Sequence, residues 1–192
     1  MMTFLARNGG TPTLLPSPDY AELYGLFPDP EGAPEAELVP GAAVPEPYHG
    51  LLVHTHHMTV TVERFYGQSV DVRVLDSCLN DREYARKILL ALSGSGAVVQ
   101  FGVVQLDLDL LSPVVREQII EQKTPLGRVL IQNHVFRRVQ PAAYLKVMPN
   151  RSMCGWFGLT EPEETYGRLG VIFCDGKPAI EVLEVMAPVR GR

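Results

Sequence analysis

Residues 123 to 130, with the sequence KTPLGRVL, carry residue types that could bind an anion. Thr124 is a favourable N-cap and Pro125 suits the first position of a helix, so a helix is expected to begin here. The backbone amides of Leu126 and Gly127 would then be free donors at the positive end of the helix dipole. The two basic side chains of the stretch are Lys123 and Arg128. This pattern predicts a carboxylate or phosphate site, and an ordinary capped helix that binds nothing is the alternative.

Glu184 is the second candidate, because it lies among apolar residues in the last predicted strand. Strand alternation places it on one face with Ile180, Val182 and Met186, and places Glu181 on the opposite face with Leu183 and Val185. A carboxylate on the inward face must be hydrogen-bonded, paired or protonated, and a raised pKa would suit Glu184 to proton transfer. The alternative is a solvated glutamate at the edge of the sheet.

Histidines form a third group, at His54, His56 and His57, with His49 nearby. On a strand His54 and His56 would point the same way and could begin a metal site, but no third ligand has a diagnostic spacing. Metal chemistry is therefore the least favoured interpretation. We expect structural histidines near a pocket rim, with His57 supporting the site through hydrogen bonding.

The composition indicates one folded domain in the cytoplasm. The chain has 192 residues, of which 46% are hydrophobic and 20% are charged. No apolar run approaches the length of a membrane span, and the N-terminus lacks the features of a signal peptide. Three cysteines without metal-type spacing suggest reduced thiols. The oligomeric state cannot be read from the sequence.

Negative charge and proline are concentrated in the first fifty residues, which hold seven acidic residues, one basic residue and nine of the sixteen prolines. We predict that residues 1–48 form a proline-rich acidic arm, in which only residues 20–26 could form a short helix. Residues 49–192 are predicted to form the folded domain. Their near-neutral charge argues against binding to nucleic acid, which needs a concentrated basic face.

Hydrophobic patterning predicts an alternation of strands and helices in this domain. Residues 51–63 favour a strand, alone or running into a short helix, and residues 70–74 alternate as a half-buried strand. Residues 81–92 fit either a helix or a turn and strand, and residues 97–106 form a buried strand after the turn at residues 93–96. Ser112 and Pro113 begin an amphipathic helix that extends to Gln122.

The C-terminal third divides into an irregular part and a regular one. Residues 137–164, which contain three prolines, are predicted to form a loop or flap with one short strand near residues 144–147. Residues 170–174 and 179–187 are predicted to form a β-hairpin around the turn Asp175-Gly176-Lys177-Pro178.

Five segments together resemble the chorismate lyase family (chorismate pyruvate-lyase, or 4-hydroxybenzoate synthase) and chorismate-lyase-like proteins. They match in order over about 130 residues. The segments are HMTVTVE (57–63), ARKILL (85–90), KTPLGRVLI (123–131), YGR (166–168) and GKPAIEVLEVMAP (176–188). The resemblance implies a single α+β domain, in which helices cover a highly curved, mostly antiparallel sheet around an internal ligand site.

The resemblance also implies an activity and a set of site residues. Enzymes of this family eliminate pyruvate from chorismate to leave 4-hydroxybenzoate, without metal or organic cofactor. By position, Arg86 would hold the ring carboxylate, Met58 and Leu126 would give backbone contacts, and Glu184 would lie near the ring hydroxyl. Arg86 and Glu184 are thus the implied catalytic residues of a carbon–oxygen lyase. The expected partner is a small aromatic or cyclohexadiene carboxylate, with no contact to nucleic acid or membrane.

One departure from the family pattern limits the expected substrate. Phe101 stands where the bacterial enzymes have a second arginine, so one cation for the two carboxylates of chorismate is missing unless another arginine replaces it. The candidates for that replacement are Arg73, Arg128 and Arg168. The alternative function is a noncatalytic module of the same fold that binds a small aromatic carboxylate, since related folds serve as sensing domains in bacterial regulators.

Overall fold

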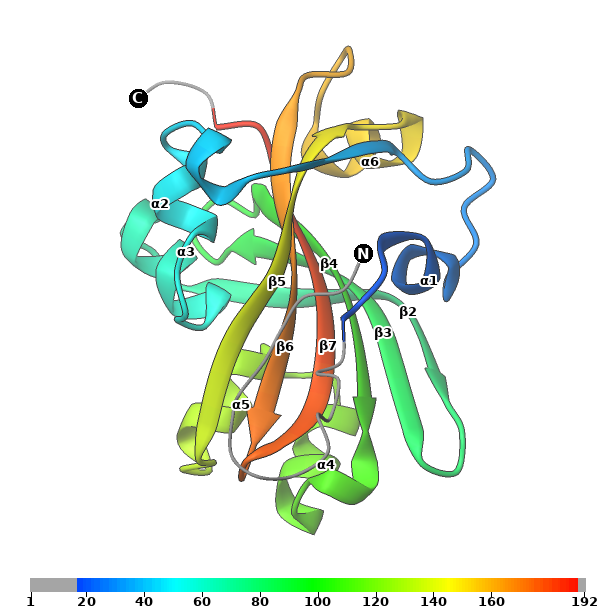
Figure 1. The fold of residues 1–192 in the computed structure, drawn as a ribbon, viewed down its shortest axis with the longest axis vertical. Coiled ribbons are helices and arrows are strands. Elements are labelled where there is room, and N and C mark those ends of the chain that lie inside the picture. The colour runs from blue at the N-terminus through cyan, green and yellow to red at the C-terminus, as the bar shows by residue number, and fades with distance from the viewer. Residues whose placement is uncertain (1–16, 190–192) are drawn as a thin grey trace, which may run out of the picture.

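The computed structural model describes residues 17–189 and contains one seven-stranded antiparallel sheet with helices on both faces (Figure 1). The strand order is β1-β5-β6-β7-β4-β3-β2. The strands are β1 (Glu35–Val39), β2 (Val70–Leu79), β3 (Glu83–Leu92), β4 (Val98–Asp107), β5 (Arg137–Met148), β6 (Thr165–Cys174) and β7 (Lys177–Met186). The helices are α1 (Tyr20–Gly25), α2 (Tyr48–Leu52), α3 (Met58–Tyr66), α4 (Pro113–Ile120), α5 (Leu126–Gln132) and α6 (Arg151–Phe157), with short 3-10 turns at Gly41–Ala43 and Leu108–Leu110. The expected α+β architecture is confirmed.

Two groups of helices cover the two faces of the sheet. On one face, α4 and α5 pack at one end and α2 and α3 at the other, as Figure 1 shows. The opposite face is covered by α1 and α6, whose buried aromatic residues surround Phe101 of β4. All described parts of the chain therefore contribute to burying a single sheet, and the face under α3 and α5 carries the candidate site.

The strand register explains which side chains share that face. Directly opposed residues of an antiparallel pair place their side chains on the same side of the sheet. One row across the sheet reads Ile88, Gly102, Glu184 and Arg168, and the next row reads Arg86, Val104 and Val182. Arg86 of β3 and Glu184 of β7 therefore lie on the same face, although 98 positions of sequence numbering separate them.

Several predicted elements are confirmed at nearly the expected bounds. Ser112 caps α4 by accepting a hydrogen bond from the amide of Val115 at 3.5 Å. The predicted hairpin joins β6 to β7 through Asp175 and Gly176, which both have a positive φ, as a tight primed turn requires. The ambiguous residues 81–92 form a strand, β3, nine of whose ten residues are buried.

The strand predicted in residues 51–63 does not form, whereas the short helix of the alternative prediction is present as α3, which begins at Met58 and ends before Gly67. Met58 and Val62, one helical turn apart, are buried against the sheet, and Gly67 ends the helix in the left-handed conformation. Burial of this face outweighs the weak strand preference of valine and threonine.

Residues 137–164 also differ from the predicted loop, because they form the twelve-residue strand β5 followed by helix α6. Pro141 lies at a register irregularity between β5 and β6, where a missing amide donor is tolerated. Asn150 caps α6 through the amide of Met153. The prolines therefore mark a bulge and a helix start.

The proline-rich segment is more regular than the sequence indicates. Residues 20–25 form α1, in line with the predicted short helix, and Leu23 and Tyr24 are buried. Glu35–Val39 forms strand β1, which pairs with β5, so the arm contains a regular element besides the predicted short helix. The strand fits because β1 is an edge strand and its prolines lie outside its bounds. The domain boundary at residue 48 stays a prediction, and residues 1–16 lie outside the described part.

Candidate functional site

A small cavity lies between the sheet and the N-terminal ends of α3 and α5. The volume open to the centre of a water molecule is about 50 Å³. Apolar side chains of β3, β4, β6 and β7 form most of its wall. The polar or charged side chains that line it are His57, Thr59, Arg86, Gln100, Arg168 and Glu184. At Gly102 the floor carries no side chain, and a Cβ there would lie 3.3 Å from the carbonyl oxygen of Leu183.

Arg86 is the cation of this cavity that has two guanidinium nitrogens without a protein partner among the described residues. Its side chain is 1% exposed, and its Nε and Nη1 atoms donate to no group among residues 17–189. The Oε1 atom of Gln100, also buried, accepts no hydrogen bond from these residues. In the described chain only four buried side-chain polar atoms are unpaired, and three of them belong to these two cavity residues. Burial lowers the pKa of Arg86, and the Tyr84 hydroxyl opposes that shift.

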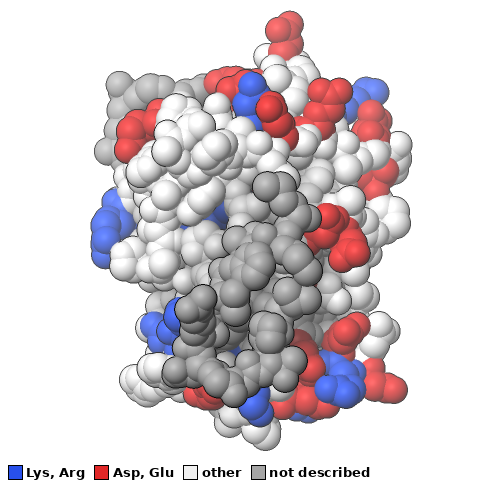
Figure 2. Space-filling view, viewed as in Figure 1, with Lys and Arg blue, Asp and Glu red and all other residues white. Residues whose placement is uncertain are grey.

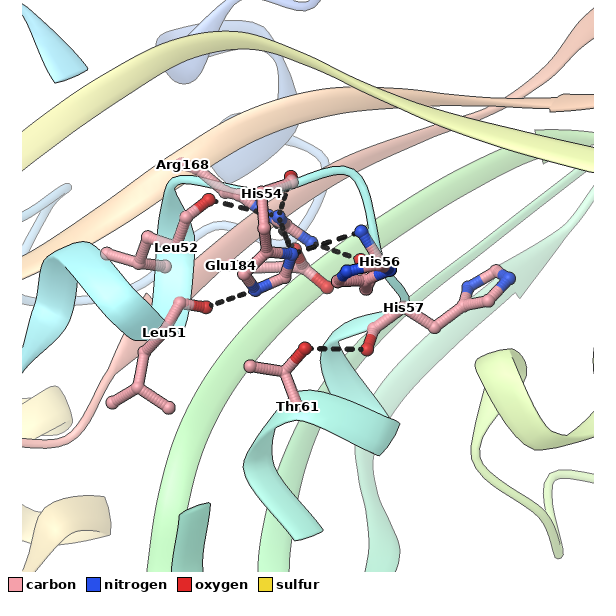
Figure 3. Close-up of polar contacts among 8 residues, drawn as sticks. All are labelled: Leu51, Leu52, His54, His56, His57, Thr61, Arg168 and Glu184. Carbon is pink, nitrogen blue, oxygen red and sulfur yellow. Dashed lines mark hydrogen bonds and ion pairs between the residues drawn. The ribbon is translucent and has the colours of Figure 1, made fainter. Parts of the chain in front are cut away.

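Arg168 is equally buried, but its hydrogen bonds are made within the protein (Figure 3). Its Nε donates to Glu184 at 2.6 Å. Its Nη1 donates to the carbonyls of Leu52 and His54 at 3.1 Å each, and its Nη2 donates to that of His56 at 3.4 Å. Arg168 thus fixes the loop between α2 and α3, and the ion pair compensates the burial of Glu184.

His57 lies on the other side of that loop, and Figure 3 shows its ring pointing away from Arg168. Its Nε2 accepts a hydrogen bond from the Nε of Arg137 at 2.6 Å, so this nitrogen carries no proton. Burial, with the charges of Arg137 and Arg168, lowers the pKa of His57 to about 4. His57 is therefore neutral at pH 7 and accepts a hydrogen bond from Arg137, and its role in supporting a ligand site stays a prediction.

Gly127 explains why the two helix ends can meet at the cavity. A Cβ at this position would lie 3.0 Å from Thr59 Oγ1 and 3.2 Å from the Cβ of His57. Only glycine therefore allows α5 to approach α3 this closely. The helix begins at Leu126 with Pro125 as its N-cap, one residue later than predicted, and Thr124 makes no cap hydrogen bond. The proline ring fixes the extended backbone entry into the helix.

Seven of the eight predicted site residues line the cavity. They are His57, Met58, Arg86, Leu126, Gly127, Arg168 and Glu184. The eighth, Arg128, lies outside the cavity lining and pairs with Glu63 of α3. Arg128 and Arg168 are thus both engaged by glutamates, so neither is a free second cation. Arg73, the third candidate, donates to the carbonyl of Gly96 in a hairpin turn.

Two residues of the site were missed by sequence reasoning. Gln100 lies one position before Phe101, and the alternation of β4 places Gln100, Gly102 and Val104 on the cavity face. Phe101 points to the opposite face, where it stacks on Trp156 at 5.2 Å. The alternation of β4 could have identified Gln100. Arg137 had no comparable signal, because its strand was predicted to be a loop.

The histidines form no metal centre in residues 17–189, where no three histidine, cysteine or acidic side chains gather as ligands. The rings of His54 and His56 stack at 5.6 Å in the loop before α3, rather than alternating along a strand. Within the same residues no helix is both long and apolar enough to cross a bilayer. The cytoplasmic location stays a prediction.

The depressed pKa of His57 predicts an acid-sensitive fold. Above pH 6.5 the His57 ring is neutral in both the folded and the unfolded chain, so His57 does not lower the free energy of unfolding there. As the pH falls from 6.5 to about 4, the unfolded chain binds a proton at His57 that the folded chain does not, so stability falls. We expect a loss of about 2–3 kcal/mol from this residue. Urea unfolding of wild type and His57→Gln at pH 7 and pH 4.5 measures it. Equal pH dependence of the two proteins would contradict the assignment.

Comparison with known proteins gives a fold likeness only. No family model and no curated protein sequence matches the chain. PhnF from Mycobacterium smegmatis superimposes with a TM-score of 0.54 and 11% identity, covering 71% of this chain and 65% of PhnF. The effector domain of PhnF gives a TM-score of 0.53 and 12% identity, covering 69% of this chain and 88% of that domain. A GntR-family transcriptional regulator from Bacillus cereus gives a TM-score of 0.43 and 12% identity, and the match covers 64% of this chain and 96% of the regulator chain.

These similarities correct the expected family and activity. The sequence resemblance predicts a chorismate lyase that forms 4-hydroxybenzoate and pyruvate, with Arg86 and Glu184 as catalytic residues. The similar structures are effector or regulator domains, so the lyase assignment and its substrate and products are wrong. The protein therefore has a chorismate-lyase-like α+β fold, and the effector domain of PhnF is similar to it in structure.

Proposed function

We propose that this protein is a noncatalytic binding domain for a small organic carboxylate. The observation that carries the proposal is the buried guanidinium of Arg86, which faces the cavity with two unpaired nitrogen atoms. An unpaired buried charge costs several kcal/mol, and a bound anion offsets that cost. A carboxylate would accept charge-assisted hydrogen bonds from Arg86, and these are stronger than bonds between neutral groups.

The rest of the cavity favours an organic anion over a bare ion. Ile88, Leu90, Val104, Ile172 and Val182 form an apolar wall around Arg86. This pairing of apolar walls with few directed polar groups is typical of small-molecule sites. Gln100 would contact a donor group on the ligand through its unpaired Oε1. We assign Glu184 a binding and structural role, because its carboxylate already accepts from Arg168.

Ligand size follows from the cavity volume. The cavity of about 50 Å³ is smaller than the cavity of about 150 Å³ that binds benzene in another protein. A short aliphatic carboxylate would enter without rearrangement, whereas an aromatic carboxylate would require the wall to move. The fold likeness to the effector domain of PhnF supports a role in which the ligand is sensed rather than transformed.

We therefore expect propionate to bind more tightly than its neutral isostere propionamide, by about tenfold or more, since only propionate offers a charge to Arg86. Chemical-shift titration of the wild-type protein at constant ionic strength measures both affinities. Benzoate and benzamide form a second pair that tests the aromatic ligand. Equal binding of acid and amide in both pairs would overturn the proposal, because the charge of Arg86 would then not recognise the ligand.

A further inference from the structure

A second, larger pocket lies outside the cavity, on the far side of His57. It has a volume of about 650 Å³ and opens to the surface between α3 and the start of β5. We name it the outer pocket. Its lining residues are Thr55, His56, His57, Val60, Thr61, Arg64, Ile131, His134, Val135, Phe136, Arg137 and Val139. His57 and Val139 line both the cavity and the outer pocket, so the two are neighbours.

The lining of the outer pocket is basic in an acidic protein. It contains two arginines and no aspartate or glutamate, whereas the whole chain has a formal charge of −5. Three histidines also line it, of which His57 is neutral at pH 7. Figure 2 shows acidic and basic side chains mixed along the top and lower right of one face, and basic side chains on its left edge. The positive lining is therefore a local feature of this pocket.

The two arginines are not neutralised by the residues that the structure describes. Arg137 uses Nε for His57 and Nη1 for the carbonyl of Val135 at 3.0 Å, and its Nη2 donates to no group in residues 17–189. Arg64, on α3, makes no side-chain hydrogen bond or ion pair within the same residues. Glu46 borders an adjacent groove with Arg64, but its carboxylate contacts His49 and the amide of Gly50.

We propose that the outer pocket is a second anion site, separate from the carboxylate site, that binds a tetrahedral phosphoryl group. The donors come from three segments: His56 in the loop before α3, Arg64 on α3, and His134 and Arg137 around the start of β5. Donors that approach from several directions suit a group whose oxygens also point in several directions. A planar carboxylate accepts in one plane and would meet fewer of them.

The same pocket has an apolar side that suits the organic part of a phosphate ester. Val60, Ile131 and Phe136 line it, and Phe136 is 77% exposed. Free phosphate and a phosphomonoester share the phosphoryl group, but only the ester would contact these side chains. Tighter binding of phenyl phosphate than of inorganic phosphate would assign the site to an ester, and equal binding would assign it to the free ion.

The test is a titration of the full chain with inorganic phosphate and with phenyl phosphate, followed by chemical shifts at fixed ionic strength. We expect both to bind wild type more tightly than acetate does. Arg64→Gln should weaken phosphate binding about three- to tenfold and Arg137→Gln about tenfold or more, the scale of a charged hydrogen bond at an exposed and at a half-buried position. Arg151→Gln, which removes an exposed arginine of α6 outside both pockets, is the matched control and should change nothing.

Two outcomes would overturn the proposal. One is equal affinity for phosphate and acetate, which would show a general attraction of anions. The other is an equal loss in Arg64→Gln and Arg151→Gln, which would show that only net charge matters. Propionate binding by Arg64→Gln separates the two sites: it should match wild type, since Arg64 lies outside the cavity lining. A failure of the carboxylate proposal therefore leaves this test intact.

Discussion

Arg86→Met is expected to abolish measurable carboxylate binding while making the ligand-free protein more stable. Methionine is apolar and flexible enough to occupy the arginine stem, so the wall of the cavity stays filled. The loss of two charged hydrogen bonds should weaken propionate binding by about 100-fold. Because the unpaired guanidinium is buried at 1% exposure, its removal should raise the free energy of unfolding by about 1–3 kcal/mol.

The opposite signs of the two effects make this experiment informative. Titration with propionate measures the affinity, and urea unfolding without ligand measures the stability. Arg86→Lys is the matched control, because it keeps the charge but cannot place donors at two separate nitrogens, so most of the affinity should still be lost. If Arg86→Met binds propionate as wild type does, the carboxylate lies elsewhere. If the Arg86→Met variant is strongly destabilised, the guanidinium of Arg86 makes stabilising hydrogen bonds within the ligand-free protein.

Arg168→Met should have the opposite effect on stability, although Arg168 is buried to the same extent as Arg86. The substitution leaves the Glu184 carboxylate without its cation and removes the Arg168 donors from the carbonyls of His54 and His56. The carbonyl of Leu52 loses one of its two donors and keeps the amide of His54. Breaking a buried pair from one side costs about 3–5 kcal/mol. We expect a loss of this size in urea unfolding, large enough to unfold a marginally stable domain.

A double variant shows whether the unpaired charge causes that loss. Arg168→Met combined with Glu184→Leu removes both charges, so it should be more stable than Arg168→Met alone by about 1 kcal/mol or more. The hydrogen bonds that Arg168 donates to the loop carbonyls are still missing, so the recovery should be incomplete. A loss below about 1 kcal/mol in the single variant would show that Arg168 does not hold the loop.

The contrast between these two arginines also shows where sequence reasoning ends. Both were proposed as ligand contacts, although the sequence left residues 81–92 open between a helix and a strand and predicted the last hairpin only from residue 170. Their difference depends on residues far away in the sequence: Arg168 meets the loop before α3, more than 110 positions earlier, whereas no described residue meets Nε of Arg86. Hydrogen-bond partners of this kind are set by tertiary packing, which no local pattern encodes.

The sequence by itself determined the elements whose signals are local. Alternation placed Glu184 and Glu181 on opposite faces of β7, the Ser-Pro pair predicted the start of α4, and the Asp-Gly pair predicted the last hairpin. In each case the signal lies within a few residues of the feature that it predicts. The site residues named from the sequence also depended on a resemblance that identified the fold but not the activity.

Only the tertiary structure decided the elements that depend on burial and pairing. The run at residues 58–66 became a helix because one of its faces packs on the sheet, and residues 137–148 became a strand because β1 and β6 supply its hydrogen bonds. Arg137 entered the site through that strand, where it reaches His57. The outer pocket likewise exists only because α3 and the start of β5, about seventy positions apart, meet in space.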